Sequence, residues 1–150
     1  IKNQDFIPIT DERMTRFMIS LDKGVELVWK AFDDMLGGEI YVKKIPSIKI
    51  TNIAKVIAPK SKFKIIGIRP GEKLHEQMIS YEDSHYTYEY SDYFKILPQI
   101  NNWDKDNSRI KDGVKVLNGF TYSSDNNLEW MTKADLQTWV DTNKHYIGNI

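Results

Sequence analysis

The 150 residues predict an α/β fold. Short apolar segments and amphipathic helical segments alternate along residues 1–79, a hairpin pattern follows, and a further amphipathic helix lies near the C-terminal end. Strands alternating with helices are typical of α/β proteins rather than of sandwiches or bundles. We therefore expect an α/β unit with an added β-hairpin and a C-terminal helix.

The predicted elements follow one another along the chain. Pro8 disfavours a helix in residues 1–19, so that segment is expected to be a strand or loop. After it we expect a helix over 21–36, a strand over 39–42, a turn at Pro46-Ser47, a helix over 49–58, a strand over 63–68, a turn over 69–72, a short helix over 73–79, a hairpin through Ser91-Asp92, a polar loop over 99–113 and a helix over 133–143.

The two helices with the clearest pattern have recognisable ends. One apolar face recurs every three or four residues in the first of them. Its members are Leu21, Val25, Val28, Trp29, Phe32, Met35 and Leu36. Ser20 can cap that helix and Gly37-Gly38 can supply a left-handed C-cap. The helix over 133–143 has Thr132 as its N-cap and Asp135 at the capping-box position, and it is expected to bury Leu136, Trp139 and Val140.

Composition limits the classes of function. Lys and Arg number 21, Asp and Glu also number 21, and the net charge is zero, which argues against nucleic acid or an anionic membrane as a partner. The absence of Cys excludes disulfides and thiolate zinc sites, and it fits a cytoplasmic protein. No apolar run approaches the ~18 residues of a membrane helix.

Two basic segments are candidates for ligand binding. In Arg69-Pro70-Gly71-Glu72, a predicted strand ends in a turn that presents one guanidinium and one carboxylate. Guanidinium can bind a phosphate through two hydrogen bonds, and a carboxylate can accept from a sugar diol. Arg16, with Arg13 nearby, precedes the first helix and could add a second cation for a diphosphate. From spacing alone, a charged turn and solvated or paired Arg residues remain the commoner interpretations.

Other groups give weaker signals. The sequence contains no Gly-rich nucleotide loop of the GxGxxG or GxxxxGK[ST] type. His75, His85 and His145 are isolated from one another, so a metal site is not expected.

Four segments resemble a known family. They are PITDERMTRFMISLDKGVELV (8–28), GGEIYVKKIPSIKITNIAKVIAP (37–59), IIGIRPGEKLHEQMI (65–79) and FTYSSDNNLEWMTKADL (120–136). Together they closely resemble the C-terminal part of the inverting UDP-N-acetylglucosamine 4,6-dehydratases of pseudaminic-acid synthesis, within the extended short-chain dehydrogenase/reductase superfamily. The GIRPGEKLHE motif is the most specific part of the resemblance.

The resemblance implies a role for five residues. Arg16 and Arg69 would grip the diphosphate of UDP-N-acetylglucosamine, Glu72 would bind the uridine ribose, and Pro8 and Ile9 would lie against the uracil. The NADP-binding Rossmann core and the catalytic groups would belong to an N-terminal domain outside these residues. The resemblance also implies a cytoplasmic, homo-oligomeric lyase that makes a 4-keto-6-deoxy UDP-sugar for bacterial surface glycans.

The chain is thus expected to be a portion of a longer enzyme and to be inactive alone. Its opening on Ile1 agrees with that expectation. We expect residues 1–98 to form the UDP-sugar-binding domain, 99–118 a connector, and 119–150 a tail with the last helix. Two alternatives remain: a fragment of a UDP-sugar 4-epimerase or capsule-type dehydratase, and a non-catalytic UDP-sugar-binding or interaction module.

Overall fold

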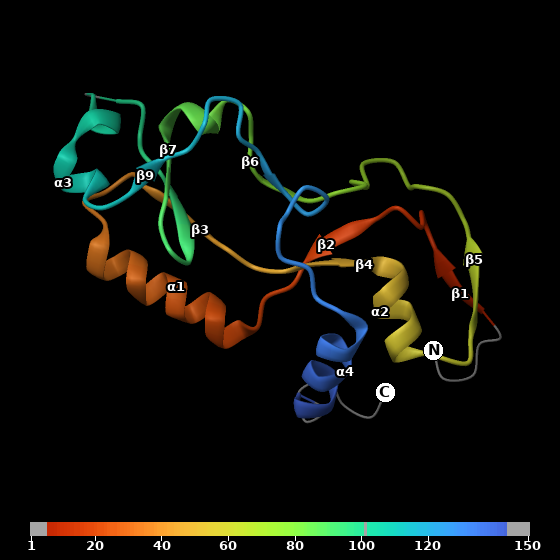
Figure 1. The fold of residues 1–150 in the computed structure, drawn as a ribbon. Helices are drawn as coiled ribbons and strands as arrows, with labels where there is room; N and C mark the ends of the chain where they lie inside the picture. Colours follow the sequence, from red (N-terminus) through yellow and green to blue (C-terminus); the bar gives the residue numbers. More distant parts are fainter. Residues whose placement is uncertain (1–5, 101, 144–150) are drawn as a thin grey trace. The chain divides into compact units, whose positions relative to one another are not determined.

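The computed structural model describes residues 6–100 and 102–143. The chain divides into two compact units, each assembled from separate stretches of sequence (Figure 1). The first unit comprises Ile1–Met18, Pro46–Glu76 and Asn127–Ile150, and the second comprises Ile19–Ile45 and Gln77–Asn126. Strands and helices occur in both units, which confirms the predicted α/β class.

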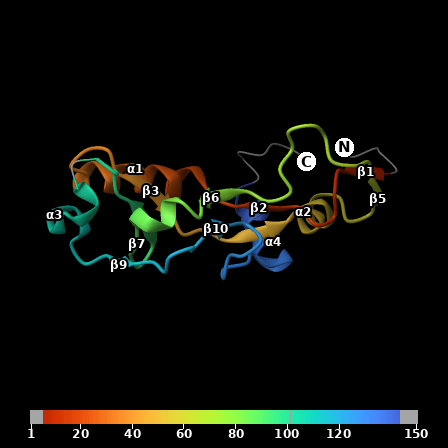
Figure 2. The ribbon, with the colours of Figure 1, turned by 90° about the horizontal axis from the view of Figure 1, so that it is seen from above.

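The first unit contains two pairs of strands. Strand β1 (Phe6–Ile9) runs parallel to β5 (Lys62–Ile65), and the two lie side by side in Figure 2. Strand β2 (Thr15–Phe17) pairs antiparallel with β4 (Ser47–Lys49). A parallel pair requires a crossover connection, and here that connection contains α2 (Ile50–Ile57), which contacts β1.

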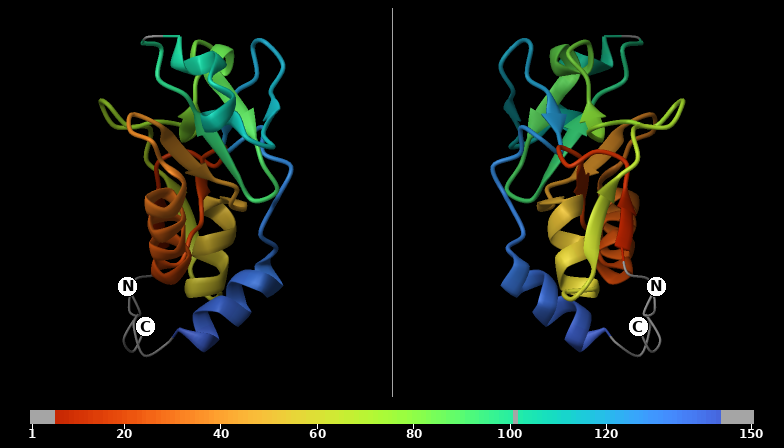
Figure 3. Two further views of the ribbon diagram at one scale, coloured as in Figure 1. Left: turned by 90° about the vertical axis from the view of Figure 1, so that its left-hand side faces the viewer. Right: turned by 90° about the vertical axis from the view of Figure 1, so that its right-hand side faces the viewer.

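Two helices enclose the apolar core of the first unit. Helix α2 packs against α4 (Lys133–Thr142), as the two views of Figure 3 show. The core consists of buried Ile48, Leu136 and Val140, with Met18, Ile53, Val56, Met131 and Trp139 packed against them. Helix α4 begins with the predicted capping box, since Thr132 accepts from the Asp135 backbone N–H and the Asp135 carboxylate accepts from that of Thr132.

The second unit is built on an antiparallel sheet of order β3-β8-β7-β9. Its strands are β3 (Ile40–Lys43), β8 (Tyr93–Ile96), β7 (Thr87–Glu89) and β9 (Val114–Lys115). The hairpin through Ser91-Asp92 is confirmed, because β7 and β8 pair around it and the Tyr90 N–H donates to the Tyr93 carbonyl at 2.9 Å. Beside this sheet, β6 (Gln77–Ile79) pairs with β10 (Tyr122–Ser123), and the remaining elements are α1 (Leu21–Asp34), η1 (Asp83–Tyr86), η2 (Trp103–Lys105) and α3 (Asn107–Ile110).

Helix α1 confirms the predicted N-terminus but ends earlier than expected. The Ser20 hydroxyl accepts from the Lys23 N–H, whereas Met35 already has extended backbone, with φ −69° and ψ 144°. Gly37 and Gly38 do have positive φ, but they lie in the following loop rather than at the helix cap. The apolar face of α1 is exposed, with Leu21 83%, Trp29 65% and Phe32 59% accessible.

Four other expectations were wrong in detail. Residues 73–79 form a loop followed by β6 instead of a helix, because the Lys73 and Leu74 carbonyls accept from β2. Ser47 begins strand β4 where a turn was expected, since it pairs with Phe17. The strand expected over 63–68 stops at Ile65, where its partner β1 also ends. The polar loop over 99–113 contains η2 and α3, which Asp106 caps through the Ser108 N–H.

A buried charge cluster stabilises the second unit. The Asp34 carboxylate accepts hydrogen bonds from Tyr41, Lys95 and Lys111. Lys95 is only 1% exposed, and it also donates to the Arg109 carbonyl at 2.8 Å. Burial opposes the ionisation of Asp34, yet these donors hold its pKa well below the ordinary value. The cluster joins the end of α1 to the sheet and to α3.

Candidate functional site

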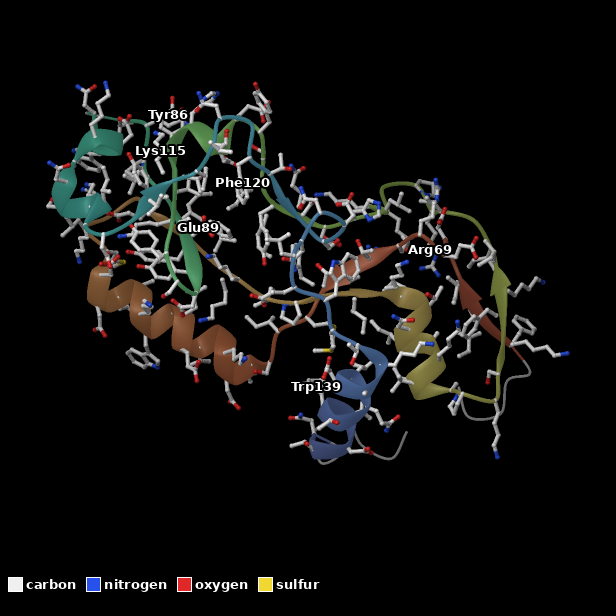
Figure 4. The ribbon with its side chains drawn as sticks, in the orientation of Figure 1. Arg69, Tyr86, Glu89, Lys115, Phe120 and Trp139 are labelled. Atoms are coloured by element: carbon white, nitrogen blue, oxygen red, sulfur yellow. The ribbon has the colours of Figure 1, made fainter. Side chains whose placement is uncertain are left out.

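The candidate site lies where two parallel strands of the first unit end. Strands β1 and β5 finish in register at Ile9 and Ile65, and the Ile66 N–H extends the ladder to the Ile9 carbonyl at 2.9 Å. The carboxyl ends of parallel strands share one edge, which is where α/β proteins commonly bind ligands. Thr10 follows β1 at this edge, and Arg69 lies on the segment that follows β5 (Figure 4).

The turn that carries Arg69 and Glu72 has defined geometry. The Glu72 N–H donates to the Arg69 carbonyl at 3.1 Å, which closes a β-turn over 69–72. Gly71 has φ +78°, the value that the third residue of a type II turn requires and that other residues adopt only with strain. Pro70 before it suits the second position of the same turn. The Pro-Gly pair therefore sets the direction in which the two charged residues leave the chain.

The Glu72 carboxylate is held from two directions. One oxygen, Oε2, accepts from the Arg69 backbone N–H at 3.1 Å, and Oε1 accepts from the Thr10 hydroxyl at 3.2 Å. These contacts fix the carboxylate against the end of β1. An ionised carboxylate has about four acceptor positions, so it can still accept from a ligand hydroxyl.

The Arg69 guanidinium, unlike the Glu72 carboxylate, is not held by other groups of the described chain. Arg69 is exposed, and within residues 6–100 and 102–143 its side chain takes part in no hydrogen bond or ion pair. A cation without an internal partner, placed on a fixed turn beside a fixed carboxylate, can bind an anion without first breaking an internal contact. This is the feature of the site that most directly suggests an anionic ligand.

Arg16 lies on β2 and is engaged with the same turn-bearing segment. Its Nη1 donates to the carbonyls of Thr15 at 2.7 Å and Leu74 at 3.1 Å, and its Nη2 donates to the Lys73 carbonyl at 2.9 Å. Nε lies 3.4 Å from the Glu76 carboxylate. Arg16 therefore joins β2 to residues 73–76, and most of its N–H groups already have acceptors.

Pro8, Ile9 and Arg13 are the other residues that the sequence indicated. Pro8 is exposed on β1, whereas Ile9 is 2% exposed and packs in the interior. Arg13 is paired with Asp11 through its Nε at 3.0 Å and Nη2 at 2.8 Å. The side-chain hydrogen bonds from Arg13 lower the pKa of Asp11 to about 2. Arg13 is thus occupied locally, as the commoner interpretation of the sequence held.

Three contacts at this site were not predicted from the sequence. They are the bond from Thr10 to Glu72, the ion pair of Arg16 with Glu76, and a 2.7 Å hydrogen bond between the Thr15 hydroxyl and His75 Nδ1. Each joins residues about sixty positions apart, so no local spacing could have indicated them. His75 and Glu76 lie within the GIRPGEKLHE motif, but the motif by itself assigns neither of them a role.

The second unit carries a surface hollow of about 530 Å³ between Lys30, Lys44, Glu89, Tyr90 and Tyr93. Its cations already have partners: Lys44 pairs with Glu89 at 2.7 Å, and Lys30 pairs with Asp92 at 3.1 Å and lies over the Tyr93 ring. Figure 4 shows Glu89 on β7. These contacts account for the hollow as part of the hairpin surface.

Metal and cofactor binding can be tested against the residues present. In the part of the chain that the structure describes, no group of three or more His, Asp or Glu residues is arranged to hold a metal ion. The sequence contains no Gly-rich phosphate loop of the GxGxxG or GxxxxGK[ST] type. None of the described helices has both the length and the apolar character needed to cross a bilayer.

The first unit is of the α/β class, and Arg69 and Glu72 lie beyond the carboxyl ends of its parallel strands, the position at which α/β proteins commonly bind ligands. Residues 1–98 match the model of a family described as polysaccharide biosynthesis protein. The chain belongs to that family.

Known proteins share extended similarity with the chain. It is 53% identical over 135 residues to a UDP-N-acetylglucosamine 4,6-dehydratase (inverting) of Campylobacter jejuni, covering 87% of this chain and 40% of the relative. A UDP-glucose 4-epimerase of Rickettsia canadensis is 38% identical over 100 residues, or 64% of this chain and 29% of the relative. The crystal structure of Pen from Bacillus thuringiensis superposes with a TM-score of 0.75 and 26% identity, over 95% of this chain and 42% of that one. The chain thus spans 40% of the dehydratase relative's length and resembles part of a longer protein.

Proposed function

We propose that this chain is the UDP-sugar-binding portion of an inverting UDP-N-acetylglucosamine 4,6-dehydratase. The longer enzyme would be a cytoplasmic lyase of the extended short-chain dehydrogenase/reductase superfamily. It would make a 4-keto-6-deoxy UDP-sugar for bacterial surface glycans of the pseudaminic-acid type. The observation that carries the proposal is the exposed Arg69 guanidinium, which has no partner among the described residues, on the same turn as the anchored Glu72.

In this proposal, different residues of the first unit bind the diphosphate, the ribose and the uracil of the ligand. Arg69 binds the diphosphate, because a guanidinium can donate two parallel hydrogen bonds to a phosphate. Arg16 supports the same group with the N–H that its carbonyl partners leave available. Glu72 accepts from the ribose hydroxyls, and exposed Pro8, supported from within by buried Ile9, provides an apolar surface for the uracil.

The chemical steps are assigned to the rest of the longer protein. NADP has no Gly-rich loop to bind among these residues, so we place the cofactor and the proton-transfer groups outside them. Binding and orientation of the sugar nucleotide is the contribution of this chain. We also propose that the complete enzyme is a homo-oligomer, which light scattering on the complete polypeptide would test.

The exposed apolar face of α1 supports membership in a longer protein. Soluble proteins rarely leave a continuous row of large apolar side chains in water. The chain spans 40% of the dehydratase relative's length, and in a polypeptide as long as that relative a further part would be able to cover this face. We propose that the cofactor-binding domain packs on it.

Activity of the complete polypeptide tests the function. With UDP-N-acetylglucosamine and NADP, we expect mass spectrometry to detect a product lighter by one water, with a 4-keto group. A product of unchanged mass with an inverted C4 hydroxyl would favour the epimerase alternative, to which the Rickettsia relative points. Binding of UDP without any conversion would instead favour the non-catalytic module. The 150 residues alone should show no turnover.

A further inference from the structure

Residues 69–76, here called the RPGE segment, contain two halves with different contacts. The first half, Arg69 to Glu72, forms the turn that presents the candidate ligand-binding groups. The second half, Lys73 to Glu76, faces β2 and holds Arg16 through carbonyls and a carboxylate. One short segment thus carries Arg69 and also determines where the Arg16 guanidinium points.

Glu76 is the acidic partner of Arg16. The other acceptors around the guanidinium are neutral carbonyls, whereas Glu76 Oε1 lies 3.4 Å from Nε. Both side chains are partly exposed, Arg16 24% and Glu76 43%, so the pair lies at the surface where a ligand can reach it. A guanidinium has about five N–H donors, and these contacts leave one on Nη2 for an incoming phosphate oxygen.

The backbone under this pair is held independently of Glu76. The Thr15 N–H donates to the Leu74 carbonyl at 3.2 Å, and the Thr15 hydroxyl shares a 2.7 Å hydrogen bond with His75. Thr15 is 3% exposed, so these contacts are shielded from water. Removal of the Glu76 carboxylate should therefore release Nε of Arg16 while the RPGE segment keeps its place on β2.

We propose that Glu76 is a positioning residue for the diphosphate site, which it orients by holding Nε of Arg16. The inference rests on the proposed function, because it assumes that Arg16 and Arg69 share one diphosphate. Without Glu76, the carbonyls still hold Nη1 and Nη2, but Nε loses its acidic partner, so the guanidinium is less tightly restrained and the ligand must restrict it further on binding. The loss should affect phosphate recognition and leave recognition of the nucleoside unchanged.

Calorimetry on the complete polypeptide separates these effects. We expect Glu76→Ala to weaken the binding of UDP about two- to fivefold, the range typical of a partly exposed ion pair. Uridine, which has no phosphates, should bind the variant as well as it binds the native protein. Glu76→Gln should restore much of the UDP affinity, because its amide oxygen can still accept from Nε. Glu12→Ala removes an exposed carboxylate of the same unit outside this contact and should leave both affinities unchanged.

A double-mutant cycle identifies the route of the effect. If Glu76 acts through Arg16, then Glu76→Ala should cause no further loss of UDP affinity in an Arg16→Ala background. The inference is overturned if Glu76→Ala causes the same loss of UDP affinity in both backgrounds, or if it leaves UDP affinity unchanged. It is also overturned if Glu76→Ala lowers the affinities for uridine and UDP equally and lowers the thermal stability as well. Failure of the proposed function is a separate result, in which the native protein does not bind UDP or Arg69→Ala leaves its affinity unchanged.

Discussion

Arg69→Ala should separate ligand binding from folding more cleanly than any other change at the site. The guanidinium is exposed and has no partner among the described residues, so its removal breaks no internal contact. Substitutions at such positions usually change stability by less than about 0.5 kcal/mol. The turn itself survives, since Pro70, Gly71 and the backbone of residue 69 are retained.

The expected loss of affinity follows from the contacts that the guanidinium can make. A hydrogen bond to a charged group contributes about 1.5–3 kcal/mol. Loss of one such contact to the diphosphate therefore weakens UDP binding by about 10- to 150-fold. Lys73→Ala provides the matched control, because it removes an exposed positive charge from the same segment while its carbonyl, which holds Arg16, remains.

The assay is isothermal calorimetry with UDP on the complete polypeptide, together with differential scanning calorimetry for stability. We expect Arg69→Ala to lose affinity with an unchanged Tm, and Lys73→Ala to change neither strongly. Equal losses for the two variants would show that only the general positive charge of the segment matters. Unchanged affinity in Arg69→Ala would refute the assignment of this residue to the diphosphate.

Further predictions concern the turn and the buried cluster. Glu72→Ala should weaken UDP binding less than Arg69→Ala does, measured by the same calorimetry. Glu72 contacts a neutral hydroxyl of the ribose, whereas Arg69 contacts the charged diphosphate. Gly71→Ala should lower the free energy of unfolding by about 1–2 kcal/mol in urea titrations, because φ +78° strains a residue with a Cβ. Lys95→Met should lower the free energy of unfolding by about 1.5–3 kcal/mol in the same titrations, because Asp34 loses its buried charged donor while it keeps Lys111 and Tyr41, and restored stability in Lys95→Met with Asp34→Leu would confirm that cause. Because the folded pKa of Asp34 lies below its unfolded value, its contribution is present above about pH 4 and is lost as the pH falls towards the folded pKa. Asp34→Asn should therefore flatten the acid side of the stability profile, and an unaltered profile would contradict this.

Local patterns predicted the regular elements well. The α1 face, the Thr132–Asp135 capping box and the Ser91-Asp92 hairpin depend on residues a few positions apart, and the structure confirms all three features. Prediction failed where a long-range partner decided the conformation. A helix was expected over residues 73–79, yet the carbonyls of Lys73 and Leu74 accept from Arg16 and Thr15 on β2, and those bonds exclude a helix there.

The sequence alone was enough to identify the family and the candidate ligand-binding groups. The GIRPGEKLHE motif and the turn propensities of Pro70 and Gly71 are local, so Arg69 and Glu72 could be identified without coordinates. Only the tertiary structure distinguished the two arginines, because their partners are distant in the chain. Arg69 is an exposed cation that has no partner within residues 6–100 and 102–143, whereas Arg16 is already held by the carbonyls of residues 73–74 and by Glu76. The two arginines differ because of hydrogen bonds between segments about sixty residues apart. Those hydrogen bonds depend on the parallel pairing of β1 with β5 and on the contact of β2 with residues 73–76.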